Sequence, residues 1–173
     1  MPKKNGKWII YVDYRELNKA TKKDHFPLPF IDQVLDGLVE RKFFSFLDGF
    51  SGYSQIQISP EDHDKTTFTC PWGTFAYQVL PFGLCNAPAT FQRVVMSIFF
   101  ELVHDSVEIY MDEFTPYGSN FQEALTNLLA KCIEMNLSRS PEKCEFLMTE
   151  GIVLSHTISQ QGLQVDPKNI VII

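Results

Sequence analysis

The stretch VEIYMDEFT, residues 107–115, places two apolar strand-like segments on either side of two adjacent carboxylates. This pattern is typical of a β-hairpin whose tip carries Asp112 and Glu113. A third acid, Asp48, ends another apolar segment, FFSFL at residues 43–47. Strand ends that carry carboxylates can meet at one edge of a sheet and hold divalent cations, as two-metal phosphoryl transfer requires. An acid pair alone also fits ordinary turn chemistry, because hairpin tips often carry Asp.

The length and composition predict one globular domain. The chain has 173 residues, of which 45% are hydrophobic and 15 are Phe, and this is enough for a sizeable core. Its apolar segments are too short to cross a bilayer, and no signal segment opens it, so we expect an intracellular protein without a membrane partner. Four scattered cysteines without a C-x-x-C pair are interpreted as reduced thiols, with a zinc site as the alternative.

The charge is distributed unevenly. The net charge is −6, which argues against nucleic-acid binding, but residues 1–23 hold seven Lys or Arg against two acids, so that segment carries +5 and the remainder −11. A basic lobe beside an acidic body suits a site that takes phosphates on one side and cations on the other. The alternative is a solvated basic edge.

The order of elements predicts an α+β fold. Helices are expected at 31–38, from 88 to 102 and at 121–132, and strands at 8–14, 43–47, 53–59, 66–70, 74–80, 107–115, 144–147 and 152–158. A ferredoxin-like antiparallel sheet backed by two helices on one face accommodates this order. Such a sheet places Asp48 close to Asp112, although the two are far apart in the sequence.

Four long motifs occur in a fixed order: VDYRELNK at 12–19, DGFSGY at 48–53, LPFGLCNAPATFQ at 80–92 and YMDE at 110–113. With these motifs, nearly the whole chain resembles the reverse transcriptase of gypsy-type LTR retrotransposons. The resemblance implies a single reverse transcriptase domain over residues 1–173, with about 1–45 and 60–80 forming part of the fingers and the rest forming the palm of a right-hand polymerase. Thumb and RNase H are expected to be absent from this chain.

The resemblance implies an RNA-directed DNA polymerase, which adds deoxynucleotides to the 3′ end of a primer on an RNA or DNA template. Two Mg²⁺ ions, with Mn²⁺ as the alternative, are expected on Asp48, Asp112 and Glu113. The family usually has Asp at the third position. Because Glu is one methylene longer, we expect its carboxylate to overshoot a site built for Asp.

The resemblance also assigns residues to the substrates. Tyr53 is expected to form the floor of the sugar pocket and to select deoxynucleotides over ribonucleotides. The other expected nucleotide-binding residues are Lys3, Lys4, Gly49, Phe50, Phe82 and Gly83, and the expected primer grip is Leu154, Ser155 and His156.

Several positions depart from the family pattern. Ile9 replaces an Arg that would contact the triphosphate, Ser155 replaces a Gly, Pro116 lies in the second hairpin strand, and Arg139 stands where an apolar residue is usual. Together with Glu113, these departures suggest impaired catalysis. The alternatives are therefore a degenerate, non-catalytic retrotransposon remnant and a nucleic-acid-binding module without chemistry. Other parts of a retrotransposon polyprotein are the expected partners, and the expected location is the cytoplasm, with virus-like particles and the nucleus as alternatives.

Overall fold

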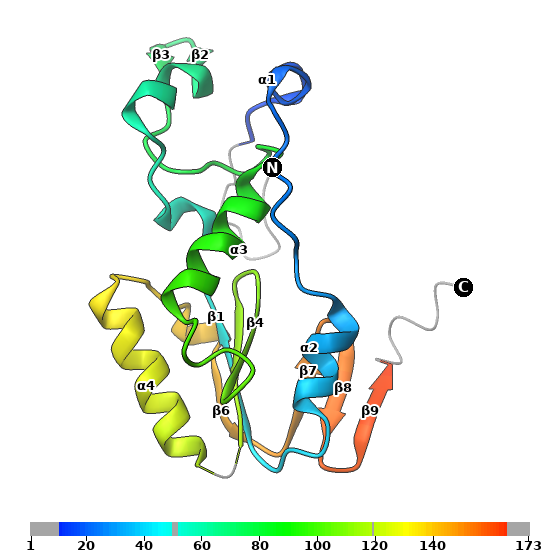
Figure 1. The fold of residues 1–173 in the computed structure, drawn as a ribbon. Coiled ribbons are helices and arrows are strands. Elements are labelled where there is room, and N and C mark those ends of the chain that lie inside the picture. The colour runs from blue at the N-terminus through cyan, green and yellow to red at the C-terminus, as the bar shows by residue number, and fades with distance from the viewer. Residues whose placement is uncertain (1–10, 50–51, 119, 166–173) are drawn as a thin grey trace. The chain divides into compact units, whose positions relative to one another are not determined.

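The computed structural model describes residues 11–49, 52–118 and 120–165, and Figure 1 shows the order of the elements. The chain divides into two compact units. The first unit comprises Met1–Phe26 and Ser51–Phe91, and the second comprises Pro27–Phe50 and Gln92–Ile173. The segment Pro27–Phe50 belongs to the unit that contains the large sheet. No helix in the described part of the chain is long and apolar enough to cross a membrane.

The first unit consists of short elements. They are α1 (Arg15–Ala20), the 3₁₀ turns η1 (Gly52–Gln55) and η2 (Pro60–Thr66), and the hairpin strands β2 (Phe68–Cys70) and β3 (Gly73–Phe75). The hairpin confirms the prediction made from the turn residues at 71–73, although its strands are shorter than expected. The buried Tyr14 anchors the N-terminal segment, because its hydroxyl donates a hydrogen bond of 3.1 Å to the carbonyl of Thr66.

Two strand predictions in the first unit are wrong. Residues 11–14 form no strand, and the remainder of the expected 8–14 strand lies outside the described residues. The expected strand at 53–59 begins instead with η1, in which the amide of Ile56 bonds to the carbonyl of Tyr53 at 3.0 Å. Later in this segment, Gln57 forms an isolated antiparallel bridge with Val79. The local turn provides hydrogen-bond partners for backbone N–H and C=O groups that would otherwise have paired with a neighbouring strand.

The second unit is built on a four-stranded antiparallel sheet in the order β4-β5-β1-β6. The strands are β1 (Phe44–Asp48), β4 (Val107–Tyr110), β5 (Glu113–Pro116) and β6 (Glu145–Met148). β4 and β5 form the predicted acid-tipped hairpin, and β5 pairs with β1 so that Leu47 lies opposite Phe114 and Asp48 opposite Glu113. The non-local pairing of β1 with β5 brings the two strand ends together.

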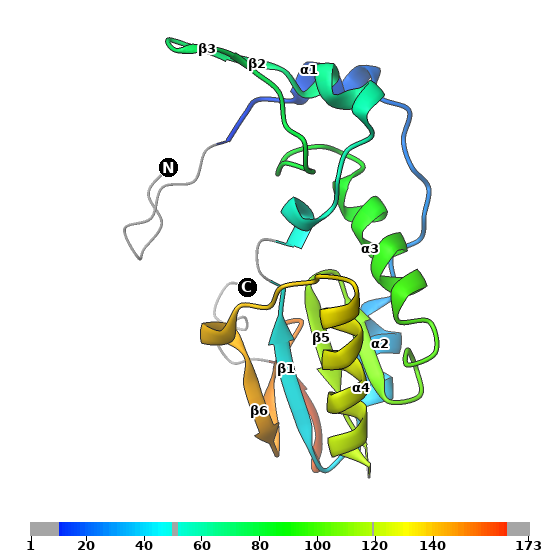
Figure 2. The ribbon, with the colours of Figure 1, turned by 90° about the vertical axis from the view of Figure 1, so that its left-hand side faces the viewer.

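Helices cover one face of this sheet, as predicted. The expected second helix is α3 (Ala87–Ile98), which begins in the first unit, and the third is α4 (Phe121–Glu134). Phe99, just beyond α3, packs edge-on against Phe114 with 5.3 Å between ring centroids. Figure 2 shows α4 lying along the sheet. Because side chains alternate along a strand, Leu47 and Phe114 both point to this helical face.

The opposite face is also covered, which the sequence analysis did not anticipate. It carries α2 (Ile31–Leu38) and a three-stranded sheet of β7 (Glu150–Val153), β8 (His156–Ser159) and β9 (Gly162–Val165) (Figure 1). Their shared core consists of Val34, Leu35, Leu38, Phe44, Tyr117, Val153 and Ile158. By the same alternation, Asp48 and Glu113 point to this second face.

A glycine allows β7 to approach the sheet closely. A Cβ atom added to Gly151 would lie 2.0 Å from Cε2 of Phe46 in β1, so any side chain at this position would displace the ring. The contact lets β7 lie against the Phe46 ring. The strand thereby lines the same cavity as Asp48 and Glu113, at the acidic end of the sheet.

Candidate active site

The structure brings the three predicted acids to one end of the sheet. Asp48 is the last residue of β1, Glu113 is the first residue of β5 directly opposite, and Asp112 lies in the hairpin turn between β4 and β5. The backbone amide of Gly49 donates a hydrogen bond of 2.8 Å to the carbonyl of Asp112, which joins the end of β1 to the turn. Residues far apart in the sequence therefore form one acidic cluster.

Gln92 holds the hairpin tip in place. It is fully buried on α3, its amide nitrogen donates to the carbonyl of Ile109 at 3.3 Å, and its amide oxygen accepts from the amide of Met111 at 2.7 Å. Met111 has a φ of 55°, a left-handed conformation that a non-glycine residue adopts only when its surroundings enforce it. Sequence reasoning quoted Gln92 within the LPFGLCNAPATFQ motif but gave it no role. The sequence feature that could have pointed to Gln92 is a polar residue within the apolar face of the predicted helix.

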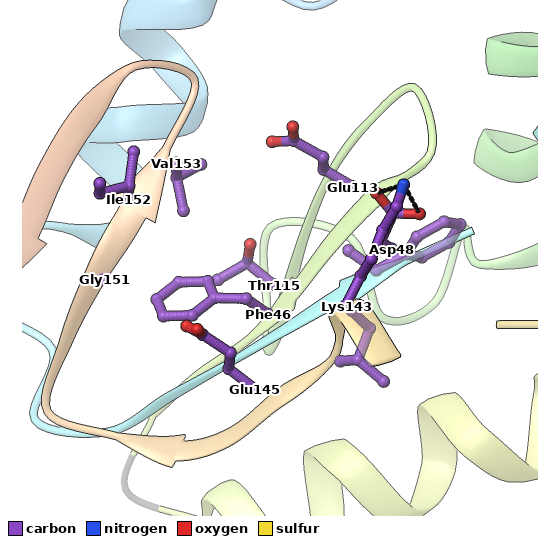
Figure 3. A pocket seen from close by; sticks show the side chains of 11 residues that line it. Phe46, Asp48, Glu113, Thr115, Lys143, Glu145, Gly151, Ile152 and Val153 are labelled. Atoms are coloured by element: carbon purple, nitrogen blue, oxygen red, sulfur yellow. Dashed lines mark hydrogen bonds and ion pairs between the residues drawn. The ribbon is translucent and has the colours of Figure 1, made fainter. Parts of the chain in front are cut away.

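Lys143 is a second residue that the sequence analysis missed. It ends the 3₁₀ turn η3 (Pro141–Lys143), and its ammonium group donates to both carboxylate oxygens of Asp48 at 3.0 and 2.9 Å (Figure 3). This hydrogen bond, together with the charges of Asp48 and Asp112, raises the pKa of Lys143. The amide of Ser140 bonds to the carbonyl of Asp48 at 2.9 Å and fixes the segment beside β1. No local motif in the sequence points to this pairing.

The Glu113 carboxylate takes a different direction. Figure 3 shows it turned away from Asp48 and Lys143, toward the β7–β8 hairpin. Although Glu113 keeps contact with solvent, partial desolvation raises its pKa. The charges of Asp112 and Asp48 raise the pKa further, and the Leu154 amide opposes them. The three acids therefore interact electrostatically, but their carboxylates do not all converge.

A cavity of about 340 Å³ opens beside these acids. It is lined from β1 and β5 by Asp48 and Glu113, from η3 by Lys143, and from β7 by Ile152 and Val153. Phe46 and Gly151 lie farther along the sheet from Asp48, and the carboxylate of Glu145 lies beside Phe46 (Figure 3).

The donor set suits a hard divalent cation. Carboxylate oxygens are the ligands that Mg²⁺ and Mn²⁺ prefer, and the Lys143 ammonium shows that the Asp48 oxygens can hold a cation. Over residues 11–49, 52–118 and 120–165, however, no group of three or more His, Cys, Asp or Glu side chains is arranged to hold a metal ion. The acids therefore fit Mg²⁺ or Mn²⁺ in charge and in ligand type. All three carboxylates could bind the same pair of ions only if the Glu113 side chain rotated toward Asp48 and Asp112.

The predicted primer grip forms the tight turn between β7 and β8. Leu154 and Ser155 have φ values of 48° and 66°, so both central residues are left-handed, as a two-residue hairpin turn of this kind requires. The Nδ1 atom of His156 donates to the carbonyl of Leu154 at 2.9 Å, which identifies Nδ1 as the protonated nitrogen. The turn is thus well defined without the Gly that the family usually has at residue 155.

Three of the predicted nucleotide-binding residues lie in the first unit. Tyr53 packs edge-on against Phe82 at 5.3 Å and against Phe91 at 5.6 Å between ring centroids, so Tyr53 and Phe82 are in direct contact. Gly83 has a φ of 101°, and an added Cβ would contact Tyr14 at 3.6 Å. Its carbonyl accepts a hydrogen bond of 2.7 Å from Asn18, which belongs to the VDYRELNK motif.

Other expected residues lie outside the described part of the chain. They are Lys3, Lys4, Ile9 and Phe50.

The structure accommodates two of the sequence departures. Arg139 stacks its guanidinium 3.8 Å from the centroid of the Phe114 ring and donates to the Sγ atom of Cys132 at 2.9 Å. Pro116 is the last residue of β5, where it pairs with Val107 at the end of the hairpin. A strand end tolerates the missing N–H of proline, so neither residue disrupts the sheet.

The chain belongs to the reverse transcriptase family, because the family model described as "Reverse transcriptase (RNA-dependent DNA polymerase)" matches residues 1–165.

Curated relatives agree with this assignment. The chain is 38% identical over 177 residues to the retrovirus-related Pol polyprotein from transposon 412 of Drosophila melanogaster, covering 97% of this chain and 14% of that polyprotein. It is 34% identical to the transposon Tf2-3 polyprotein of Schizosaccharomyces pombe, covering 98% of this chain and 13% of that one. The chain therefore spans about a seventh of the length of these relatives, which are LTR retrotransposon Pol polyproteins of the gypsy type.

Solved structures show the same fold. The foamy viral protease–reverse transcriptase in complex with double-stranded DNA superposes with a TM-score of 0.88 at 25% identity, over 99% of this chain and 37% of that one. The same viral protein in complex with an RNA/DNA hybrid gives a TM-score of 0.86 at 24% identity, over 96% of this chain and 23% of that one. The mixed α+β fold expected from the sequence is thereby confirmed.

Proposed function

We propose that this chain is the fingers–palm part of an RNA-directed DNA polymerase that adds deoxynucleotides to a primer 3′ end. The observation that carries the proposal is the meeting of Asp48 and Asp112 at one end of the sheet, in a chain of the reverse transcriptase family. A carboxylate at the end of a strand and another in the adjoining hairpin turn form a preorganised site for the charge that develops during phosphoryl transfer.

Asp48 and Asp112 are the residues that would hold Mg²⁺ or Mn²⁺, with Glu113 as the third acid nearby. When bound, such ions would activate the primer 3′ oxygen and stabilise the leaving pyrophosphate. Gln92 keeps the hairpin tip in position through its two backbone contacts. Lys143 balances the charge of Asp48 and adds a cation beside the cavity.

Further residues would bind the nucleotide. Tyr53, braced by Phe82 and Phe91, would form the floor of the sugar pocket and disfavour a ribose 2′-hydroxyl. Gly83 would let the incoming nucleotide approach its backbone, while Lys3, Lys4 and the amides of Gly49 and Phe50 would hold the triphosphate.

The β7–β8 turn, with Leu154, Ser155 and His156, would hold the primer end. An RNA or DNA template with its primer is the proposed macromolecular substrate, and the structural relatives solved with an RNA/DNA hybrid and with double-stranded DNA support this choice.

The relatives suggest which partners this domain has and where it acts. The named relatives are polyproteins, so we propose that the remaining parts of a retrotransposon polyprotein are the partners of this domain. Within one reverse transcriptase domain, about residues 1–45 and 60–80 would form part of the fingers and the rest would form the palm. A cytoplasmic site of action, in virus-like particles, fits such a polyprotein.

Incorporation of deoxynucleotides on a primed homopolymer RNA, measured with Mg²⁺ and with Mn²⁺, tests the proposal. Asp48→Asn should abolish incorporation, because it removes a charge that no neighbour replaces. Asp36→Asn, on the exposed face of α2, is the matched control and should leave incorporation unchanged. Equal incorporation by the unmodified chain and Asp48→Asn would refute the assignment of Asp48.

A non-catalytic remnant is the second candidate, and the direction of the Glu113 carboxylate favours it. Such a remnant should fold and bind a primer–template hybrid in a salt-dependent manner without incorporating nucleotides under any metal condition.

A further inference from the structure

The side chain of Asn18 joins α1 to the loop that precedes α3, within the first unit. Its amide nitrogen donates a hydrogen bond of 2.7 Å to the carbonyl of Gly83, and its amide oxygen accepts one of 2.8 Å from the backbone N–H of Cys85. Both contacts link segments more than 60 residues apart, since the separations are 65 and 67 residues. Asn18 therefore fixes the loop from two sides.

Asn86 makes the same kind of connection in the opposite direction. It lies directly before α3, its amide nitrogen donates to the carbonyl of Lys22 at 2.9 Å, and its amide oxygen accepts from the backbone N–H of Asp24 at 3.1 Å. The chemistry and the two connected segments match those of Asn18. Asn86, however, holds the start of α3, whereas Asn18 holds the turn at Phe82 and Gly83.

The turn at Phe82 and Gly83 depends on such side-chain contacts. Gly83 has a φ of 101°, a left-handed conformation that glycine adopts without steric penalty. The N-terminal segment lies against it, because an added Cβ at Gly83 would be 3.6 Å from Tyr14 and 3.7 Å from the carbonyl of Val12. No strand ladder includes these two residues, so the hydrogen bonds from Asn18 and this packing define where the turn lies.

Phe82 transmits the position of the turn to Tyr53. The Tyr53 ring has one aromatic neighbour on each side, Phe91 at 5.6 Å and Phe82 at 5.3 Å between ring centroids. Phe91 is 1% exposed on α3 and is held by the core, whereas Phe82 is 46% exposed, so the core constrains its ring much less. The backbone of the turn therefore decides where the Phe82 ring meets Tyr53.

We propose that Asn18 is a positioning residue for nucleotide selection. By holding the turn at Gly83, it keeps the Phe82 ring against Tyr53, and Tyr53 then stays where it excludes a ribose 2′-hydroxyl. This inference rests on the proposed role of Tyr53 as the floor of the sugar pocket. The role requires no contact between Asn18 and the nucleotide, because the effect passes through the backbone of the turn.

Three variants separate this role from a general loss of stability. Asn18→Ala removes both hydrogen bonds. Asn18→Asp has nearly the same size and keeps an oxygen for the Cys85 amide, but it loses the donor to Gly83 and places a carboxylate oxygen against that carbonyl. Asn86→Ala is the matched control, because it removes the same two kinds of hydrogen bond between the same two segments.

NMR of the full chain, with labelled tyrosine rings and backbone amides, tests the contacts directly. The Tyr53 ring resonances should shift in both Asn18 variants and stay in place in Asn86→Ala. Exchange of the Cys85 amide should be about five- to tenfold faster in Asn18→Ala, the factor for loss of one hydrogen bond, and unchanged in Asn18→Asp. Tyr53 resonances that stay in place in Asn18→Asp, or that move equally in Asn86→Ala, would overturn the proposal.

A second readout compares dATP with ATP, which differ only in the 2′-hydroxyl. Their dissociation constants are measured with Mg²⁺ and a dideoxy-terminated primer–template at low salt, so that no incorporation is needed. The preference for dATP should fall about tenfold in both Asn18 variants, the lower end of what a pocket gains by excluding one small group, and should be unchanged in Asn86→Ala. A merely structural role would weaken both nucleotides alike, and an unchanged preference in the Asn18 variants would overturn the proposal.

Tyr53→Ala distinguishes failure of this inference from failure of the proposed function. It should lower the preference for dATP at least as far as the Asn18 variants do. An unchanged preference in Tyr53→Ala would refute the sugar-pocket role of Tyr53. A lowered preference in Tyr53→Ala, together with an unchanged preference in both Asn18 variants, would refute the role of Asn18 alone.

Discussion

At the scale of single residues, the carboxylates of Asp48 and Glu113 take different directions. Asp48 pairs with Lys143, and Glu113 turns toward the β7–β8 hairpin, so the two opposed carboxylates point apart. The ion pair and the separation lower the cost of placing several negative charges at one end of the sheet. A cation bound between Asp48 and Asp112 would compete with Lys143 and reduce the repulsion on Glu113.

The raised pKa of Glu113 predicts a pH-dependent stability difference. Below the unfolded-state pKa of Glu, about 4.3, the residue is neutral in both states and Glu113→Gln should have little effect. As the pH rises through the folded pKa, ionisation in the native state removes stability, so Glu113→Gln should become the more stable protein at neutral pH. Urea unfolding at pH 4 and pH 7.5 without divalent cations measures the difference. A difference in the free energy of unfolding between the two proteins that is largest at pH 4 would show that the pKa of Glu113 is not raised.

Lys143 should act as an internal competitor for divalent cations. Lys143→Gln frees the Asp48 oxygens and makes the site more negative, so Mn²⁺ affinity, measured by electron paramagnetic resonance, should rise about two- to fivefold, the range set by a solvent-exposed ion pair. Lys131→Gln, which removes the exposed pair with Glu134 on α4, is the control and should leave Mn²⁺ affinity unchanged. Weaker Mn²⁺ binding by Lys143→Gln would show that the lysine supports the site.

At the scale of elements, the β7–β8 turn stores backbone strain. Leu154 and Ser155 both adopt positive φ values, and Ser155 is exposed, so its side chain contributes no core packing. Left-handed conformations cost non-glycine residues about 1–2 kcal/mol, and glycine adopts them without that penalty. The turn nevertheless keeps its shape because β7, β8 and the core on either side hold it.

Ser155→Gly should therefore stabilise the domain by roughly 0.5 kcal/mol, the relief of strain less the greater entropy of glycine in the unfolded chain. Ser159→Gly, in the extended strand β8, should destabilise it by at least about 0.5–1 kcal/mol, because it also removes the Oγ that accepts the Gln161 amide at 3.2 Å, and it serves as the comparison. Chemical denaturation of both variants measures the two free energies of unfolding. The same sign for both changes would show that the conformation of the turn is not strained.

At the scale of the whole molecule, charge limits what this chain can bind. The residues after position 23 carry −11, so the body repels a nucleic-acid duplex, while the segment 1–23 carries +5. Polymerases draw much of their hybrid affinity from phosphate contacts. The basic segment must supply most of these contacts in the isolated chain.

The isolated chain should therefore bind a primer–template hybrid weakly and lose affinity steeply with salt. A fluorescence titration between about 50 and 200 mM salt should show a fall of several-fold to about a hundredfold, because only a few phosphates are neutralised. Replacing the lysines at positions 19, 22 and 23 by glutamine should flatten the salt dependence. Tight binding at physiological salt, or long extension products, would contradict this prediction.

Local patterns in the sequence predicted the acid-tipped hairpin, the helices and strand β1, because alternation and turn chemistry act between near neighbours. The α+β class and the meeting of Asp48 with Asp112 also followed from the order of elements. The expected strand at 53–59 failed because a local 3₁₀ turn competed successfully with sheet pairing. The second covered face was missed because the packing of α2 and β7–β9 is non-local.

The sequence by itself determined which acids end which strands and to which family the chain belongs, since motifs in a fixed order carry that information. Only the tertiary structure decided that Lys143 pairs with Asp48, that Gln92 holds the hairpin tip through two hydrogen bonds, and that Glu113 turns toward the β7–β8 hairpin. Those contacts join segments separated by many residues, and their geometry depends on how the strands pack across Phe46 and Gly151. Side-chain direction in a crowded acidic cluster is set by such packing and by charge repulsion, neither of which acts along the chain.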